Sequence, residues 1–210
     1  MLEVIALPVG QLATNCYLVI DRESPHSLII DPGDDADYIE RIIADKKCIP
    51  QEIIATHGHF DHILATAELK LAYKITFKIH KNDEFLVKNM QSSARHFLGL
   101  NVDSPPGVDG YLYPTKELKI GKNTLIIMET PGHTPGSICL YYKKDRILFT
   151  GDLIFAEGGR GRTDFSYSNN EDLNKSLLKI FQLPADTTIY PGHGQQFLIA
   201  SEKKFHLLQS

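Results

Sequence analysis

The sequence lacks the features that direct a chain to a membrane or to nucleic acid. Its apolar runs are short and interrupted by proline, glycine or charge, and none approaches the roughly 20 residues that a membrane-spanning helix needs. A secretory signal has a basic segment followed by a long apolar run. Residues 1–4 carry no such basic segment and begin no such run. The formal net charge of −4 provides no attraction to phosphate backbones or anionic lipids. We therefore expect neither a nucleic-acid nor a membrane partner.

Cysteine is also scarce, and its placement argues against a disulfide framework. The three cysteines, Cys16, Cys48 and Cys139, are odd in number, widely spaced and include no C-x-x-C pair. Together with the missing signal, they indicate reduced thiols and a cytoplasmic location. Cys16 and Cys139 each lie in an apolar run, which favours a role as small buried side chains.

Short strands and a few helices alternate along a chain of ordinary globular composition, with 210 residues, 42% hydrophobic and 23% charged. We expect one domain spanning residues 1–210. The pattern predicts strands over residues 3–7, 16–20, 27–30, 53–56, 75–79, 118–120, 124–128, 137–142, 146–149 and 187–190. Helices are expected over residues 34–44, 62–73, 82–90 and 170–181, with Asn82 as an N-cap and a further turn or two after residue 200.

Residues 91–114 show no regular pattern. They contain Pro105, Pro106, Gly107 and Gly110 beside Phe97, Tyr111 and Tyr113. A loop of this length inside one domain is usually a lid or a binding loop, and we expect one here.

Two predicted hairpins resemble each other. Residues 17–34 and residues 140–152 each contain paired strands followed by a turn with Gly-Asp. Each half of the chain then consists of a block of strands followed by helices. Two such halves facing each other give an α+β fold of two packed sheets with helices outside, a four-layer αββα sandwich.

Five of the nine histidines lie in three segments, each directly after a predicted strand. The segments are Thr-His-Gly-His-Phe-Asp-His at 56–62, Pro-Gly-His at 131–133 and Pro-Gly-His at 191–193. Asp152 follows a fourth strand through Gly151. Loops at one edge of a sheet are where a scaffold supports functional side chains. The residue types and their placement predict a metal centre.

The spacing of the first segment allows two imidazoles to share one ion. In an extended His57-Gly58-His59 segment, side chains two residues apart point the same way. His133 is expected to supply a third nitrogen. The glycine before His133 allows the backbone unusual angles close to an ion.

A second ion is expected next to the first. Asp61 and His62 follow where the chain turns into the next helix, and His193 would complete their set. Asp152 is the natural bridging carboxylate. Imidazole and carboxylate ligands without thiolate suit zinc, and also iron or manganese. We expect two divalent ions per chain, with zinc favoured.

Chance placement is a weak explanation for this pattern. A lone histidine is more often a core or surface residue than a ligand, but here four ligand-type residues fall within six positions. The remaining histidines have no such context, and we expect them to be structural or exposed: His26, His80, His96 and His206.

At this point the sequence resembles a known superfamily. The ordered segments T-H-G-H-F-D-H, P-G-H-T-P-G-S, T-G-D and P-G-H-G look like the metallo-β-lactamase signature and cover roughly residues 53–194. T-N-C-Y at 14–17 and G-R-T-D at 161–164 are similar to the short glyoxalase II-like, or hydroxyacylglutathione hydrolase-like, branch. The resemblance implies the αββα sandwich of the metallo-β-lactamase type and the seven metal ligands named above.

The resemblance also implies a thioester hydrolase. Two divalent ions would lower the pKa of a bridging water toward neutrality and polarise a small-molecule ester or thioester, S-D-lactoylglutathione in this branch. Asp61 and Asp152 are expected to assist proton transfer besides binding metal. Asp31 resembles the carboxylate that orients a ligand histidine, although a turn-capping aspartate fits the sequence equally well.

The expected substrate contacts follow the bridging aspartate. In the glyoxalase II family a basic residue there binds the glycine carboxylate of glutathione. Arg162 resembles that residue, with arginine where the family more usually has lysine, and Arg160 and Tyr167 are nearby candidates. The alternative is that Arg162 is a loop arginine held by Asp164. A departure from the full-length family is that only a short tail follows His193, which leaves no room for its helical glutathione-binding domain.

Other functions remain open on sequence alone. A sulfur dioxygenase of the same fold also resembles the chain at Gly-Arg-Thr-Asp-Phe, and would use one Fe(II) on His57, His133 and Asp152. A lactonase differs only in substrate. A metal-free binding protein on the same scaffold is disfavoured because no ligand of the set is missing.

Overall fold

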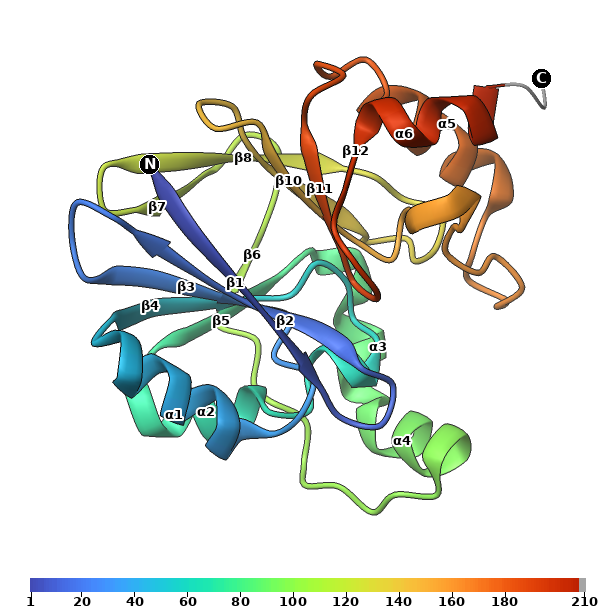
Figure 1. Ribbon diagram of the computed structural model, residues 1–210. Helices are drawn as coiled ribbons and strands as arrows, with labels where there is room; N and C mark the ends of the chain where they lie inside the picture. Colours follow the sequence, from blue (N-terminus) through green and yellow to red (C-terminus); the bar gives the residue numbers. More distant parts are fainter. Residues whose placement is uncertain (208–210) are drawn as a thin grey trace.

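Two six-stranded sheets form the centre of the computed structural model, which describes residues 1–207 (Figure 1). The first sheet has the order β1-β2-β3-β4-β5-β6, with β1–β2–β3 antiparallel and β3 to β6 parallel. Its strands are β1 (Leu2–Val9), β2 (Thr14–Asp21), β3 (His26–Ile30), β4 (Ile49–Ile54), β5 (Thr76–Ile79) and β6 (Gly110–Tyr111).

The second sheet comes from the other half of the chain and has the order β12-β11-β10-β9-β8-β7. All its neighbours are antiparallel except β10 and β11. Its strands are β7 (Glu117–Ile120), β8 (Asn123–Glu129), β9 (Ile138–Tyr142), β10 (Ile147–Gly151), β11 (Thr188–Pro191) and β12 (Phe197–Leu198).

Helices cover the outer face of each sheet, so the layers run αββα (Figure 1). On the first sheet lie α1 (Ala36–Lys46) and α2 (Thr66–Tyr73), and on the second lie α5 (Asn170–Ile180) and α6 (Ile199–Leu207). The short helices α3 (Glu84–Lys88) and α4 (Met90–Leu98) follow β5. Three 3₁₀ turns complete the set: η1 (Phe60–His62), η2 (Lys81–Asp83) and η3 (Ala156–Gly158). The predicted fold class is confirmed.

Side-chain alternation along the central strands builds the layers. Every residue of β2 is buried, with Leu18 packing toward the α1/α2 layer, while Tyr17 and Val19 pack between the sheets. In β9, Leu140 faces the inter-sheet core and Cys139 the α5 layer. Since successive side chains of a strand point to opposite faces, strands buried on both sides read as continuous apolar runs.

The three cysteines are buried and free, as their apolar context predicted for Cys16 and Cys139. Within residues 1–207 no helix is long and apolar enough to cross a membrane.

Three local predictions need correction. Residues 91–114 are not one patternless loop, because α4 occupies the first part, burying Met90 and Ala94 at helical spacing, and β6 lies near the end. Asn82 is not the N-cap: the His80 side chain accepts from the Asn82 N–H and caps η2. The helix expected from residue 62 begins at Thr66, because 56–62 is shaped by the site.

Candidate metal centre

The seven predicted ligands lie in loops that follow strands, at one edge of the sandwich. His57 follows β4, His133 follows β8, Asp152 follows β10 and His193 follows β11. Backbone hydrogen bonds between the halves fix these loops: the Ile138 N–H donates to the Thr56 carbonyl at 2.9 Å, and the Asn15 N–H to the Gly192 carbonyl at 2.7 Å. At this edge, loops from both sheets therefore meet and contribute side chains to one site.

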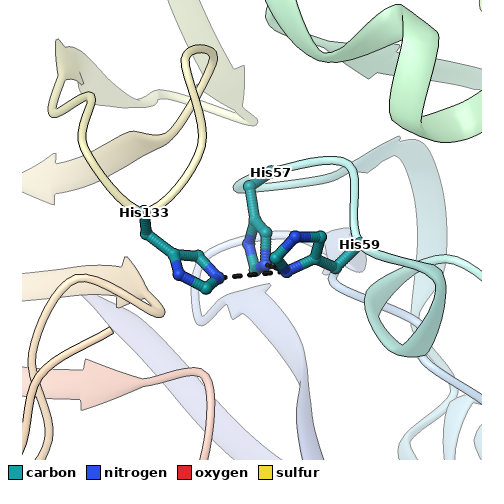
Figure 2. Close-up of side chains that lie close together, drawn as sticks. All are labelled: His57, His59 and His133. Carbon is teal, nitrogen blue, oxygen red and sulfur yellow. Dashed lines mark hydrogen bonds between the residues drawn. The ribbon is translucent and has the colours of Figure 1, made fainter. Parts of the chain in front are cut away.

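Three imidazoles converge on one point, as Figure 2 shows. His59 Nδ1 lies 3.1 Å from His57 Nε2 and 3.0 Å from His133 Nε2. His57 and His133 are buried, and His59 is partly buried. We call these residues the three-histidine group. The structure thus brings together the nitrogens that the sequence assigned to the first ion.

A second group, Asp61, His62 and His193, lies beside the first. Asp61 Oδ2 is 3.7 Å from His62 Nε2 and 3.5 Å from His193 Nε2. We call these residues the Asp61 group.

The Asp152 carboxylate lies between the two groups. Its Oδ1 is 3.4 Å from His62 Nε2, and its Oδ2 is 3.5 Å from His193 Nε2 and 3.7 Å from His133 Nε2. Gly151 turns the chain there with φ of +50°, and a β-carbon at Gly151 would lie 2.3 Å from Thr56 Oγ1. A side chain at this position would push the two loops apart.

Within residues 1–207, two buried polar atoms at the centre, His62 Nε2 and Asp152 Oδ1, make no hydrogen bond although they lie 3.4 Å apart. An unpaired buried donor or acceptor costs about 1–3 kcal/mol. Both atoms point toward the other members of the ligand set, as a cation would require. The donor set, five imidazoles and two carboxylates, fits divalent metal ions such as zinc, iron or manganese.

The imidazole nitrogens that face away from the centre contact oxygen atoms. In metal sites, a hydrogen bond of this kind orients the histidine ring and fixes its tautomer. The Nδ1 atoms of His133 and His193 contact the carbonyl oxygens of Arg162 at 2.8 Å and Leu12 at 3.1 Å. His59 Nε2 contacts the Tyr167 hydroxyl at 2.9 Å. These contacts favour the tautomers in which the inward nitrogens are free to bind metal.

Asp31 holds the remaining two histidines. Its Oδ2 lies 3.0 Å from His62 Nδ1 and accepts from the Thr56 hydroxyl at 2.6 Å, while its Oδ1 accepts from the Thr56 N–H. The Thr56 hydroxyl in turn contacts His57 Nδ1 at 3.1 Å. The orienting interpretation of Asp31 is therefore correct.

The histidine pKa values differ between the two groups. Burial and the neighbouring rings lower the pKa of His57 well below its usual range and that of His59 to about 3. Burial opposes the charged form of His193, but contacts with Asp152 and Asp61 raise its pKa to about 9. His57 and His59 are thus neutral and ready to bind metal, whereas a metal ion must displace a proton from His193.

A cavity of about 420 Å³ opens beside the ligands. One side is formed by His59, His133, Asp152, Asp61 and His193, and the other is mainly apolar or aromatic. The apolar and aromatic lining consists of Leu12, Phe60, Phe97, Leu98, Phe165 and Tyr167. Helix α4 contributes part of this wall, so the segment predicted as a lid does reach the site.

Two of the three predicted substrate residues line the cavity, and the third does not. Arg162 and Tyr167 line the cavity, whereas Arg160 does not, and its guanidinium donates to Asn174 on α5. Arg162 is exposed, forms a double hydrogen bond to Asp164 at 2.9 and 2.7 Å, and lies over the Phe165 ring. Both sequence-based interpretations of Arg162 thus describe part of its surroundings.

Sequence reasoning missed several residues that shape the site. The Thr14 hydroxyl donates to Asp61 Oδ2 at 3.0 Å, and only the T-N-C-Y segment pointed toward it. Asp83, between two metal-binding loops, carried no recognisable signal.

The αββα sandwich and its histidine–aspartate centre define a metal-dependent hydrolase scaffold. The chain belongs to the metallo-beta-lactamase superfamily, whose family model matches residues 9–193. It is 34% identical to the "Probable metallo-hydrolase YqgX" of Bacillus subtilis, covering 94% of this chain and 92% of that protein. It is 32% identical to "Hydroxyacylglutathione hydrolase GloC" of Haemophilus influenzae, covering 94% and 93%.

Two solved structures are similar over nearly the whole chain. A di-iron-bound form of TTHA1623 superposes with a TM-score of 0.88 at 32% identity, covering 98% of this chain and 100% of that one. ETHE1 from Myxococcus xanthus gives a TM-score of 0.77 at 28% identity, covering 97% and 83%. The suspected superfamily membership is confirmed, and the metallo-hydrolase relatives support a metal-dependent hydrolase.

Proposed function

We propose that the chain is a binuclear hydrolase that cleaves a small-molecule thioester of the S-D-lactoylglutathione type. The observation that carries the proposal is the pair of adjacent ligand groups with Asp152 between them. The similarity to the Haemophilus influenzae hydroxyacylglutathione hydrolase supports the substrate class.

The two ligand groups support the proposed placement of two metal ions. His57, His59 and His133 would hold one ion, Asp61, His62 and His193 the other, and Asp152 would contact both. Bound there, two divalent ions would supply a hydroxide near neutral pH and stabilise negative charge on the carbonyl oxygen.

The protein's own groups then bind the substrate and move a proton. The apolar wall, including Phe97 and Phe165, excludes water from the acyl and thiol groups. Asp61 faces the cavity while Thr14 holds its Oδ2, so this carboxylate can accept a proton from water and return it to the departing thiolate. Water and thioester thereby become a carboxylic acid and a thiol.

Arg162 and Tyr167 are the proposed substrate contacts. A glutathione carboxylate would replace Asp164 on the Arg162 guanidinium, which is exposed and so can reorient. Arg160 is a weaker candidate, because its guanidinium lies outside the cavity lining.

The test is turnover of S-D-lactoylglutathione by protein loaded separately with zinc, iron or manganese, with metal content measured on the same samples. We expect hydrolysis that disappears in Asp61→Ala. No turnover with two metals bound would remove glutathione thioesters from the proposal and leave esters and lactones to be tried.

A persulfide dioxygenase is the second candidate, favoured by the Gly-Arg-Thr-Asp-Phe segment and the likeness to the Myxococcus xanthus ETHE1. It would need a single iron on His57, His133 and Asp152. Oxygen uptake with glutathione persulfide by iron-loaded protein, without thioester turnover, would establish this alternative.

A further inference from the structure

Asp83 is a fully buried carboxylate that belongs to neither ligand group. It ends η2, directly after β5 of the first sheet, and is 0% exposed. Its Oδ2 accepts from the Gly58 N–H at 2.9 Å and from the Thr134 hydroxyl at 2.6 Å. Its Oδ1 accepts from the Gly136 N–H at 2.6 Å. One side chain thus receives three hydrogen bonds from two loops.

The two loops carry all three members of the three-histidine group. Gly58 lies between His57 and His59 in the first half of the chain, while Thr134 directly follows His133 in the second half. Asp83 therefore links two loops that follow strands of different sheets. Its hydrogen bonds within residues 1–207 go to residues close to His57, His59 and His133 in the sequence.

The glycines in both loops approach Asp83 closely, Gly136 its carboxylate and Gly58 its backbone carbonyl. A β-carbon at Gly136 would lie 2.6 Å from Asp83 Oδ1, and one at Gly58 would lie 2.7 Å from the Asp83 carbonyl oxygen. Real β-carbons are almost never this close to another heavy atom. The close approach requires glycine at both positions and explains why H-x-H and H-T-P-G contain glycine where they do.

The Asp61 group is held by other residues. His62 is oriented by Asp31, Asp61 by Thr14 and His193 by the Leu12 carbonyl. Asp31 also reaches His57 through Thr56, but none of these contacts involves Asp83, whose side-chain hydrogen bonds go to the loops of the three-histidine group.

We infer that Asp83 is a positioning residue for the three-histidine group, setting the distance between the His57–His59 segment and His133 and hence the affinity of that group for its ion. The inference rests on the metal-ligand assignment and does not depend on the substrate proposed above. Its test therefore measures metal binding, not turnover.

The first variant is Asp83→Asn, which keeps the shape but offers one acceptor oxygen. Since three donors face the position, the new amide must turn its NH₂ toward at least one of them. We expect one of the two stepwise zinc affinities, measured by competition with a chromophoric chelator, to fall about 10–100-fold. The other affinity should not change.

Two reference variants assign the affected site. His133→Ala weakens the three-histidine group and His193→Ala the Asp61 group, so Asp83→Asn should resemble a milder His133→Ala. Resemblance to His193→Ala, equal weakening of both sites or wild-type binding would each overturn the inference.

Asp21→Asn is the matched structural control. Asp21 is 1% exposed and also accepts three hydrogen bonds, from Glu23, Ser24 and Asn123, at the opposite end of β2 from the site. It should lower thermal stability without changing either zinc affinity. A fall in the same affinity as in Asp83→Asn would overturn the inference, because the effect would then be one of general stability.

A second pair keeps the inference testable if Asp83→Asn does not fold. Thr134→Val removes one of the three hydrogen bonds, and Thr134→Ser retains it. We expect weaker zinc binding at the three-histidine group in the valine variant and recovery in the serine variant. Wild-type binding by the valine variant would contradict the role of Asp83.

Discussion

The two ends of the sandwich both gather buried polar side chains, but the chemistry of the groups that meet there differs between the ends. At the far end, Asp21 accepts from Asn123 at 2.9 Å, and Asn123 accepts from the Tyr142 hydroxyl at 2.6 Å. At the ligand end, His62 Nε2 and Asp152 Oδ1 lie 3.4 Å apart, and neither makes a hydrogen bond within the part of the chain that the structure describes. A hydrogen-bonded network stabilises a fold, whereas buried imidazole and carboxylate atoms that converge without hydrogen bonds indicate a bound cation.

Strand β2 connects these ends. Thr14 at its start supports Asp61, and Asp21 at its end belongs to the far network. At about 3.3 Å per residue the two lie roughly 23 Å apart, so substitutions at one end act independently of the other. The following predictions test this separation, from the largest expected effect to the smallest.

Replacing the shared carboxylate should have the largest effect. In Asp152→Asn the uncharged amide is a poor metal ligand and cannot join two ions, so we expect turnover to fall to background and bound zinc to fall from two ions to at most one. Thioester hydrolysis and elemental analysis on the same sample measure both. Full activity with two metals would contradict the position of Asp152 in the centre.

Removing the metal should destabilise the fold, since the unpaired atoms at the ligand end then lose their partner. At a metal concentration a thousand times the dissociation constant, binding stabilises the native state by about 4 kcal/mol. For a chain of this size that corresponds to a fall in melting temperature of roughly 8–16 °C after chelation. Calorimetry with and without a chelator measures it, and equal melting temperatures would mean that no tight metal site exists.

Asp21→Asn should affect stability alone. We expect a loss of about 1–3 kcal/mol in the free energy of unfolding, with unchanged turnover, because the substitution perturbs the hydrogen bonds of a buried carboxylate. Denaturant unfolding and the thioester assay together decide the outcome.

The same variant should also change the pH dependence of stability. Burial opposes ionisation of Asp21, but hydrogen bonds from Glu23, Ser24 and Asn123 lower its pKa below the usual 3.8. Its contribution is therefore fully present above that value and is lost as the pH falls through the lower native pKa. The wild-type protein should lose this part of its stability in acid, and Asp21→Asn should not; identical acid profiles would contradict the assignment.

The smallest effect is expected at Arg162. Because its guanidinium is exposed and already paired with Asp164, Arg162→Ala should raise KM for S-D-lactoylglutathione by less than about tenfold, with little change in kcat. Arg160→Ala is the matched control, since that arginine lies outside the cavity lining, and it should leave KM unchanged. Equal effects of both variants would mean that only general charge attracts the substrate.

The sequence, with its family resemblance, was sufficient to predict which residues converge at the centre and the order of the layers. Four ligands fall within six residues, so their grouping is local, and glycine marks His133, Asp152 and His193 in their loops. Doubly buried strands such as β2 appear as uninterrupted apolar runs. These signals come from residues that are close in the sequence, and such residues also lie close together in the folded chain.

What only the tertiary structure decided lies at the edge where loops from both sheets meet. No sequence motif marks Asp83, yet its hydrogen bonds reach Gly58, 25 residues before it, and Thr134 and Gly136, 51 and 53 residues after it. Arg160 and Arg162 differ by two positions, and only packing determines that one lines the cavity and the other pairs with Asn174. The sequence determined which residues could bind metal, while the spacing, support and surroundings of those residues depended on contacts between distant segments, which no local pattern encodes.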